Sequence, residues 1–254
     1  MALLEDKIVL VNGGSQGVGA GIVRAALREG AHVTFTGRRR DVGEALAAEL
    51  AGTAFVQADL ADPVQARGSV DQVVAAHGRI DCLVNAAGLT SRGTLLDTTP
   101  ELFDAHIAIN LRAPFFAMQA AVADMVARKA PGTVVNIITS SEHGGQAFLA
   151  PYVAAKAGLA GVTRNAAHAH RWDRIRINGL NIGWTETEGE DLTQRLFHGA
   201  GDDWLEKAAK ELPMGKLGQV DEIADFVVFL LSERSGVVTG SVIDWDQNVI
   251  GALD

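Results

Sequence analysis

Hydrophobic residues along this chain follow two alternating patterns. Short runs that are apolar throughout alternate with longer segments in which apolar positions recur with the spacing of a helix. The short runs predict strands at 8–11, 33–36, 54–57, 80–85, 133–138, 176–180 and 241–244. The longer segments predict helices at 17–29, 41–51, 63–77, 101–129, 152–171 and 221–232.

The order of these elements indicates the fold class. Strands that are apolar throughout and are separated by helices indicate a parallel sheet that is covered on both faces. Because no linker, repeat or low-complexity segment interrupts the pattern, the sequence predicts a single α/β domain over residues 1–254. We expect a doubly wound parallel sheet in three layers, with helices on either side.

One stretch, residues 183–218, departs from the regular alternation. It is rich in Glu, Gly, Asp and Trp, and it follows the end of a predicted strand. In open α/β sheets, ligands lie beyond the carboxyl ends of the strands. This stretch is therefore either a lid over a binding site or an ordinary surface excursion.

Charge and cysteine content exclude several classes of function. The net charge of −9 argues against nucleic acid and anionic membranes as partners, and the only basic cluster, residues 38–40, is closed by Asp41. Cys82 is the single cysteine, so neither an internal disulfide nor a structural zinc site is expected. The N-terminus lacks a signal-peptide pattern, and the apolar run at 226–231 is too short to span a bilayer. We expect a cytoplasmic protein that needs no metal.

A glycine-rich turn lies between the first predicted strand and the first predicted helix. Gly13, Gly17 and Gly19 let the backbone approach a phosphate closely, and a helix N-terminus favours negative charge. The surrounding strand and helix strengthen the prediction of a dinucleotide pyrophosphate site. Two alternatives are a plain strand-to-helix turn and the adenosyl site of a methyltransferase.

The end of the second predicted strand is expected to meet the adenosine ribose of such a dinucleotide. An acidic residue there would bind the free 2′-hydroxyl of NAD, but the sequence has Gly37 and Arg38. Arg38 can pair with a 2′-phosphate, so NADP is favoured and NAD is the alternative. A solvated basic helix start would explain the same residues. Asp59, after the third strand, could bind the adenine edge or cap the helix that follows Pro63.

Tyr152 and Lys156 are four residues apart in a predicted helix and so share one face. An ammonium beside a phenol favours the phenolate and lowers its pKa, which yields a proton donor and acceptor. Pro151 suits the first turn of a helix, whose dipole also favours an anion. A surface Tyr/Lys pair is the simpler explanation of the spacing.

Together these motifs resemble the short-chain dehydrogenase/reductase family over essentially the whole chain. The resemblance implies a Rossmann-type fold, a nicotinamide cofactor and a homotetramer (or homodimer). The matching segments are residues 12–19, Asp59-Leu60, residues 84–88, Asn110 in residues 109–112, and the Tyr152/Lys156 pair.

The resemblance also assigns roles to individual residues. Tyr152 would be the general acid/base, Lys156 would hold the nicotinamide ribose, Asn110 would anchor a proton-relay water, and Thr139 would bind the substrate oxygen. The cofactor would contact Gly13, Ser15, Gln16, Gly17, Val18, Gly19, Gly37, Arg38, Asp59, Leu60, Asn85, Ala86, Ala87, Gly88, Tyr152, Lys156, Gly183 and Thr187.

The chain departs from the family pattern at several positions. The family has a serine thirteen residues before the tyrosine, where this chain has Thr139; Ser140 or Ser141 could take over after a small shift, but Thr139 needs no gap. Asn12 replaces the usual threonine, and Ala86 replaces an asparagine that braces the strands. The family's Pro-Gly and Asp-Gly-Gly motifs are Ile182-Gly183 and residues 244–247 here.

Residues near the expected pocket bear on the substrate. The loop before Tyr152 and the segment after the sixth strand supply Glu, His, Gln and Trp side chains, which suit a sugar, polyol or other small hydroxylated compound better than an acyl chain. Candidate substrate contacts are Ser141, His143, Gln146 and Trp184. A 3-oxoacyl-acyl-carrier-protein reductase is one alternative, although its acidic carrier would need a basic docking patch. A non-catalytic dinucleotide-binding redox sensor or scaffold is another.

Overall fold

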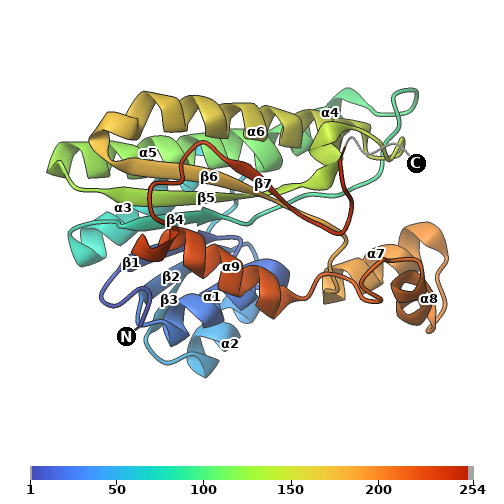
Figure 1. The fold of residues 1–254 in the computed structure, drawn as a ribbon, viewed down its shortest axis with the longest axis horizontal. Helices are drawn as coiled ribbons and strands as arrows, with labels where there is room; N and C mark the ends of the chain where they lie inside the picture. The colour runs from blue at the N-terminus through green and yellow to red at the C-terminus, as the bar shows by residue number, and fades with distance from the viewer. Residues whose placement is uncertain (1, 251–254) are drawn as a thin grey trace.

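The centre of the molecule is a parallel sheet of seven strands, as the sequence predicts. The computed structural model describes residues 2–250, and its strand order is β3-β2-β1-β4-β5-β6-β7 (Figure 1). The strands are β1 (Ile8–Asn12), β2 (His32–Gly37), β3 (Thr53–Gln57), β4 (Cys82–Asn85), β5 (Gly132–Thr139), β6 (Ile175–Ile182) and β7 (Val242–Trp245).

The strand order places a topological switch between β1 and β4. The chain winds outward from β1 to β3, returns to β4 beside β1, and then winds outward in the other direction to β7. Helices that follow β1 and β4 therefore leave on opposite faces, and a crevice opens between the two strand ends. Ligands of doubly wound sheets bind in this crevice.

Helices cover both faces of the sheet. The helices α1 (Gly17–Arg28), α2 (Arg40–Glu49) and α9 (Val220–Leu231) pack on one face, and α3 (Pro63–His77), α5 (Ala113–Arg128) and α6 (Ala150–His170) pack on the other (Figure 1). This arrangement confirms the predicted three-layer, doubly wound α/β fold.

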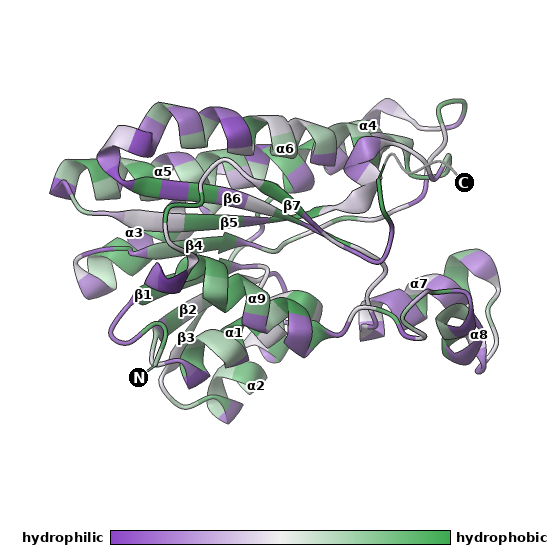
Figure 2. Cartoon of the chain, viewed as in Figure 1, coloured by the Kyte–Doolittle hydropathy of each residue, from purple (hydrophilic) through white to green (hydrophobic). Residues whose placement is uncertain are grey.

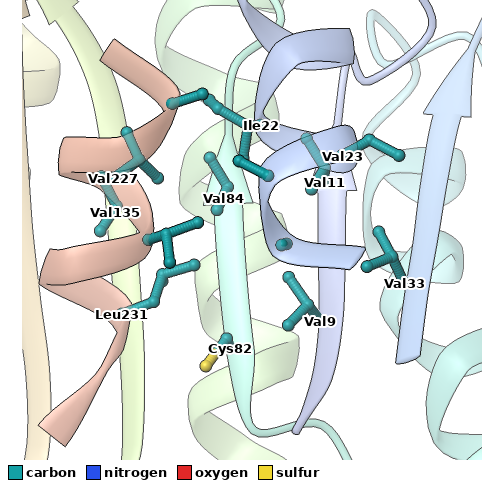
Figure 3. Close-up of a cluster of buried hydrophobic side chains, with 14 of the residues drawn as sticks. Val9, Val11, Ile22, Val23, Val33, Cys82, Val84, Val135, Val227 and Leu231 are labelled. Atoms are coloured by element: carbon teal, nitrogen blue, oxygen red, sulfur yellow. The ribbon is translucent and has the colours of Figure 1, made fainter. Parts of the chain in front are cut away.

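The core follows from the alternation of side chains along the strands. Val9 and Val11 point toward α1 and α9, whereas Leu10, between them, packs with the opposite helical layer. Figure 3 shows the first of these clusters, in which side chains from α1 and α9 meet the central strands. Because both faces of each central strand are buried, these strands are mostly apolar, which is why they were readable in the sequence.

The long helical segment predicted at 101–129 is continuous but not uniform. It consists of α4 (Pro100–Ile107), a π-helical segment at Ala108–Arg112, and α5. Thr99 caps its start by accepting a hydrogen bond from the Leu102 amide at 3.2 Å. The π-helical segment contains Asn110, and such insertions frequently mark functional sites.

The segment 183–218, predicted to be irregular, contains two helices, so that prediction was wrong in this respect. They are α7 (Glu188–His198) and α8 (Trp204–Lys210), and they lie to one side of the sheet in Figure 1. A bridge between Thr185 and Gly218 closes the base of the excursion. Its helices are short and mostly polar (Figure 2), so they contain few apolar residues from which a helix could be recognised in the sequence.

Candidate active site

The residues singled out in the sequence gather at the carboxyl edge of the sheet. The glycine turn follows β1, residues 85–88 follow β4, and Thr139 ends β5. Parallel pairing of β1 with β4 and of β4 with β5 brings these three strand ends to one edge. The first turn of α6 carries Tyr152 to the same edge, close enough to Thr139 for the threonine hydroxyl to act on the pKa of the phenol.

Close packing in the glycine turn leaves no room for side chains. A Cβ at Gly19 would lie 2.1 Å from the Gly13 carbonyl oxygen, and a Cβ at Gly13 would lie 2.6 Å from the Ala87 amide nitrogen. At the end of β2, a Cβ at Gly37 would lie 2.5 Å from the Ser15 hydroxyl oxygen. The turn can therefore bring its backbone close to a ligand only with glycine at these positions.

The start of α1 has the donors that a pyrophosphate needs. Gln16 precedes the helix but makes no side-chain capping bond, so the first helical amides remain available. The methyl group of Thr187 lies 3.8 Å from the position of a Cβ at Gly17, so the base of the 183–218 excursion lies over the turn. These residues fit a dinucleotide whose diphosphate lies at the α1 N-terminus.

Three asparagines brace the strand ends below the turn. Asn12 donates to Asn85 at 3.3 Å, and Asn85 donates to Asn136 at 2.8 Å across β1, β4 and β5. The side-chain oxygen of Asn12 also accepts a hydrogen bond from the Thr36 hydroxyl. That hydroxyl in turn accepts a hydrogen bond from the Gly13 amide. This amide ladder explains how the turn is held although Asn12 and Ala86 depart from the family pattern.

The basic residues after β2 differ in their surroundings. The Arg38 side chain is exposed, whereas Arg39 donates to the Gln16 side chain at 2.6 Å and Arg40 pairs with Glu44. Arg39 thus touches the glycine turn directly, which the sequence argument missed because neighbouring arginines look alike in a basic run. Both Arg38 and Arg39 are placed at the edge where a 2′-phosphate would lie.

The turn between β3 and α3 contains two carboxylates, those of Asp59 and Asp62, and each accepts a backbone amide. The Asp59 carboxylate accepts the Ala61 amide at 3.0 Å, and Asp62 caps α3 by accepting the Val64 amide at 2.8 Å. The acidic turn therefore does cap α3, through Asp62 and not through Asp59. Leu60 is buried beside Ala66 in a small apolar cluster.

Asn110 organises the loop after β4. Its side-chain amide donates to the Leu89 carbonyl and accepts from the Leu89 amide, both at 3.0 Å. It also lies 3.2 Å from Nδ1 of His106, whose Nε2 faces the Ser91 carbonyl oxygen at 3.1 Å. The His106 ring is in edge contact with Tyr152, with centroids 6.2 Å apart. Asn110 and His106 therefore hold the loop after β4 in place next to the ring of Tyr152.

Tyr152 is surrounded by groups with opposing effects on its ionisation. Burial raises the pKa of the Tyr152 phenol to about 12, while the Thr139 hydroxyl and the positive charge of Arg92 act to lower it and the Glu190 carboxylate acts to raise it. The sequence led us to expect a lowered pKa from Lys156. Without a cofactor the phenol is instead held in its neutral form, because desolvation outweighs its favourable neighbours.

Lys156 is buried beside the tyrosine, with only 3% of its surface exposed. Its ammonium donates to the Ile137 carbonyl oxygen at 2.7 Å and lies 5.9 Å from the Tyr152 ring centroid. Burial lowers the pKa of Lys156 to about 8. This amine therefore carries its charge at neutral pH at a cost in stability, which is typical of groups placed for function.

The pH dependence of stability should reveal that cost. Between pH 8 and 10.5 the unfolded lysine keeps a proton that the folded lysine, with its pKa of about 8, has lost, so stability rises with pH. Relative to Lys156→Met, the wild type should gain about 3 kcal/mol of unfolding free energy across this window, at about 1.36 kcal/mol for each pKa unit. Urea unfolding of both proteins at several pH values measures the gain, and a constant difference would contradict it.

Two charged residues near Tyr152 come from segments that the sequence argument left out. Arg92 lies in the loop after β4, and Glu190 lies in the first turn of α7. Glu190 accepts hydrogen bonds from Trp184 and Gln194, both at 2.7 Å. Neither residue belongs to a motif, so only the three-dimensional arrangement connects them to the tyrosine.

The four candidate substrate contacts are placed differently from one another. Ser141 donates to Gln146 at 2.8 Å, whereas His143 lies 3.0 Å from Asp244 at the end of β7 and takes part in the network around Asn181. Trp184 stacks on Trp204 and borders a cavity of about 320 Å³ between Gly183 and the segment after β7. The described contacts of His143 thus lead away from Tyr152, whereas Trp184 is linked to the tyrosine through Glu190. Within residues 2–250, no three His, Cys, Asp or Glu side chains cluster as metal ligands, and no helix is long and apolar enough to cross a membrane.

Known proteins resemble this chain along nearly its full length. The family model described as Enoyl-(Acyl carrier protein) reductase matches residues 13–247. The 3-oxoacyl-(acyl-carrier-protein) reductase FabG of Chlamydia pneumoniae is 30% identical over 244 residues, covering 94% of this chain and 95% of that protein. A 3-alpha-(or 20-beta)-hydroxysteroid dehydrogenase of Mycobacterium bovis is 31% identical over 251 residues, covering 98% and 92%. The crystal structure of gox2181 matches with a TM-score of 0.87 at 26% identity, over 95% of this chain and 94% of that one.

Proposed function

This chain belongs to the short-chain dehydrogenase/reductase family, and we propose that it interconverts a secondary alcohol and a carbonyl on a small polar substrate. Enzymes of this family are oxidoreductases that act on CH–OH groups and use NAD or NADP. The observation that carries the proposal is the placement of Tyr152 beside Thr139 and the buried Lys156, next to a glycine turn that fits a dinucleotide.

Each of these side chains has a distinct role in the proposed reaction. When bound, the nicotinamide supplies the acceptor or donor of the hydride at the carbinol carbon. Tyr152 takes the proton from the substrate hydroxyl in oxidation and returns it to the carbonyl oxygen in reduction. Thr139, whose hydroxyl acts on the pKa of the phenol, would hold the same oxygen. The Lys156 ammonium, 5.9 Å from the Tyr152 ring centroid, would bind the nicotinamide ribose.

We propose NADP as the preferred cofactor. Arg38 is exposed at the end of β2, and Arg39 reaches the glycine turn through Gln16, so two guanidinium groups border the region of the adenosine ribose. Within that region, the first acidic residue after β2 is Asp41, in the first turn of α2. A 2′-phosphate would meet positive charge there, and a free 2′-hydroxyl would lack a carboxylate partner.

Replacing Arg38 with alanine should therefore weaken NADP binding far more than NAD binding. Loss of a charge-assisted hydrogen bond corresponds to about 1.5–3 kcal/mol, or roughly 10- to 100-fold in dissociation constant. Arg39→Ala is the informative companion variant, because it reports whether the contact with Gln16 places Arg39 at the phosphate. Titration of each variant with both cofactors measures the ratio, and an equal loss for NAD and NADP in both variants would refute this assignment.

The substrate is proposed to be small and hydroxylated, in the manner of a sugar or polyol. Ser141 and Gln146 in the loop before α6, together with Glu190 in α7, supply polar groups around the tyrosine. Activity on acyl groups bound to a carrier protein, as the name of FabG indicates for that relative, is the alternative. The net charge of −9 would repel an acidic carrier and so favours the small substrate.

A screen of sugars, polyols and simple secondary alcohols with both oxidised cofactors tests the proposal. Appearance of reduced nicotinamide with at least one small polar alcohol is the expected result. Cofactor binding without turnover of any alcohol or ketone would instead favour a redox sensor or scaffold. Turnover confined to a 3-oxoacyl thioester would favour the acyl-carrier alternative.

We also propose that four copies of the chain assemble, as the family resemblance implies. Phe103 in α4 and Phe115 and Val126 in α5 are large apolar side chains that are 43%, 43% and 39% exposed, and they could be covered by a second copy. The molar mass in solution, measured by light scattering, distinguishes a tetramer from a dimer or monomer.

A further inference from the structure

Arg92 lies where three segments around the active site meet. It belongs to the loop after β4, and its guanidinium carbon lies 5.1 Å from the ring centroid of Phe148, in the loop before α6. It lies 5.6 Å from the ring centroid of Phe197, in α7 of the 183–218 excursion. A backbone hydrogen bond of 2.9 Å from Gly93 to Phe148 fixes the first two segments to each other. The guanidinium is thus held between two aromatic rings.

The hydrogen-bonding capacity of this guanidinium is only partly used. One terminal nitrogen donates to the Thr90 carbonyl oxygen at 2.9 Å, and the other lies 3.1 Å from Nε2 of His198, which must act as the acceptor. The buried Nε–H has no partner among residues 2–250. Within the same residues no carboxylate forms an ion pair with Arg92, whereas Arg195, also near the excursion, pairs with Asp191 and Asp202.

The charge of Arg92 acts on the catalytic tyrosine. Its positive charge favours the Tyr152 phenolate and opposes the effect of burial on the pKa of that phenol. The nearest opposing charge is Glu190, but its carboxylate is engaged by Trp184 and Gln194. Burial also lowers the pKa of Arg92 itself, because partial removal of the cation from water disfavours its charged form. A partly buried cation of this kind is expected to have an anionic partner.

We propose that Arg92 binds an anionic oxygen group of the substrate, a carboxylate or a phosphate, while the substrate hydroxyl is bound by Tyr152 and Thr139. This inference rests on the proposed dehydrogenase function and narrows its substrate class to hydroxylated anions. The planar guanidinium matches the paired oxygens of carboxylates and phosphates. The rings of Phe148 and Phe197 hold the guanidinium in place through cation–π contacts. Because Phe197 lies in α7, binding of the anion would also draw the excursion toward the site.

Matched sets of substrates that differ only in the anionic group test the inference. One set is gluconate, glucitol phosphate and glucitol, and a shorter set is glycerate, glycerol phosphate and glycerol. The wild type should oxidise at least one anionic member with a kcat/KM at least about tenfold above that of its neutral counterpart. Comparison of the carboxylate member with the phosphate member of each set shows which of the two anionic groups Arg92 prefers. No preference for any anion in the wild type would overturn the inference without any variant being made.

Replacement of the arginine separates recognition from a purely structural role. Arg92→Gln should lower kcat/KM for the preferred anion by about 10- to 100-fold, mainly through KM, and change the neutral counterpart less than about threefold. Arg92→Lys keeps the charge without the planar fork and should be intermediate. The matched control is Arg67→Gln, an exposed arginine on α3 that should leave both substrates unaffected. Equal losses for anionic and neutral substrates would mean that Arg92 only holds the excursion in place.

A binding measurement separates this inference from the proposed function. Calorimetry with NADP present would measure the binding of gluconate and of glycerol phosphate to the wild type and to Arg92→Gln. Arg92-dependent binding without turnover of any substrate would retain the anion site and overturn the proposed dehydrogenase function. Turnover of neutral polyols, with no anion binding that depends on Arg92, would retain the function and overturn the anion site.

Discussion

Replacing Tyr152 with phenylalanine should lower the turnover number by about 10²–10⁴-fold, the usual contribution of a positioned general acid/base. The substitution removes only the hydroxyl, so the ring keeps its edge contact with His106 and its place above Lys156. The affinity for NADP should stay within a few-fold of the wild type.

Two measurements make this expectation specific. Steady-state kinetics with whichever alcohol the wild type oxidises gives the change in turnover, and fluorescence titration with NADPH gives the change in affinity. Thr139→Val is the companion variant, since it removes the other hydroxyl of the pair while keeping the branched shape. Near-normal turnover in Tyr152→Phe would remove the tyrosine from the reaction.

Replacing Gly19 with alanine should abolish tight cofactor binding and destabilise the chain. The added Cβ would lie 2.1 Å from the Gly13 carbonyl oxygen, which is backbone and cannot rotate away. The turn would have to open, at a cost of roughly 1–3 kcal/mol as for other overpacked sites. The α1 amides would then move away from the diphosphate position, and we expect at least about a tenfold loss of NADP affinity, or about 1.4 kcal/mol.

The control for this variant is a glycine with space around it. Gly161 is a helical position in α6 where an added Cβ meets nothing within 4 Å. Gly161→Ala should therefore stabilise the chain by about 0.5–1 kcal/mol and leave NADP binding unchanged. Thermal unfolding and cofactor titration of both variants give the comparison. Tight NADP binding by Gly19→Ala would show that the cofactor does not lie against this turn.

The sequence predicted those parts of the fold that depend on a regular hydrophobic pattern or on the backbone requirements of a short segment. Strands of a covered parallel sheet are mostly apolar, so all seven were recognised, and α1, α3 and α6 were placed within a few residues of their observed bounds. The glycine turn was recognisable for a similar reason. Its Gly13, Gly17 and Gly19 satisfy requirements of backbone shape that few other residues meet.

The remaining features depend on contacts between distant segments. Helices α7 and α8 are short and have few apolar residues, so they did not stand out as helices in the sequence. The Thr187 cap of α7 and the stacking of Trp184 on Trp204 became visible only in the structure. Arg92 and Glu190 became candidates only when the fold brought them toward Tyr152. The expected effect of Lys156 on the tyrosine also failed to appear, because helical spacing says which residues share a face and nothing about burial.

Transfer of deuterium tests the central claim most directly. Wild-type protein would be incubated with NADPH deuterated at the transferable position of the nicotinamide and with a panel of small polar ketones. Mass spectrometry should find deuterium on the carbinol carbon of at least one product, and Tyr152→Phe should form that product far more slowly. If NADPH binds to the wild type but no ketone in the panel acquires deuterium, the chain is not the dehydrogenase proposed here.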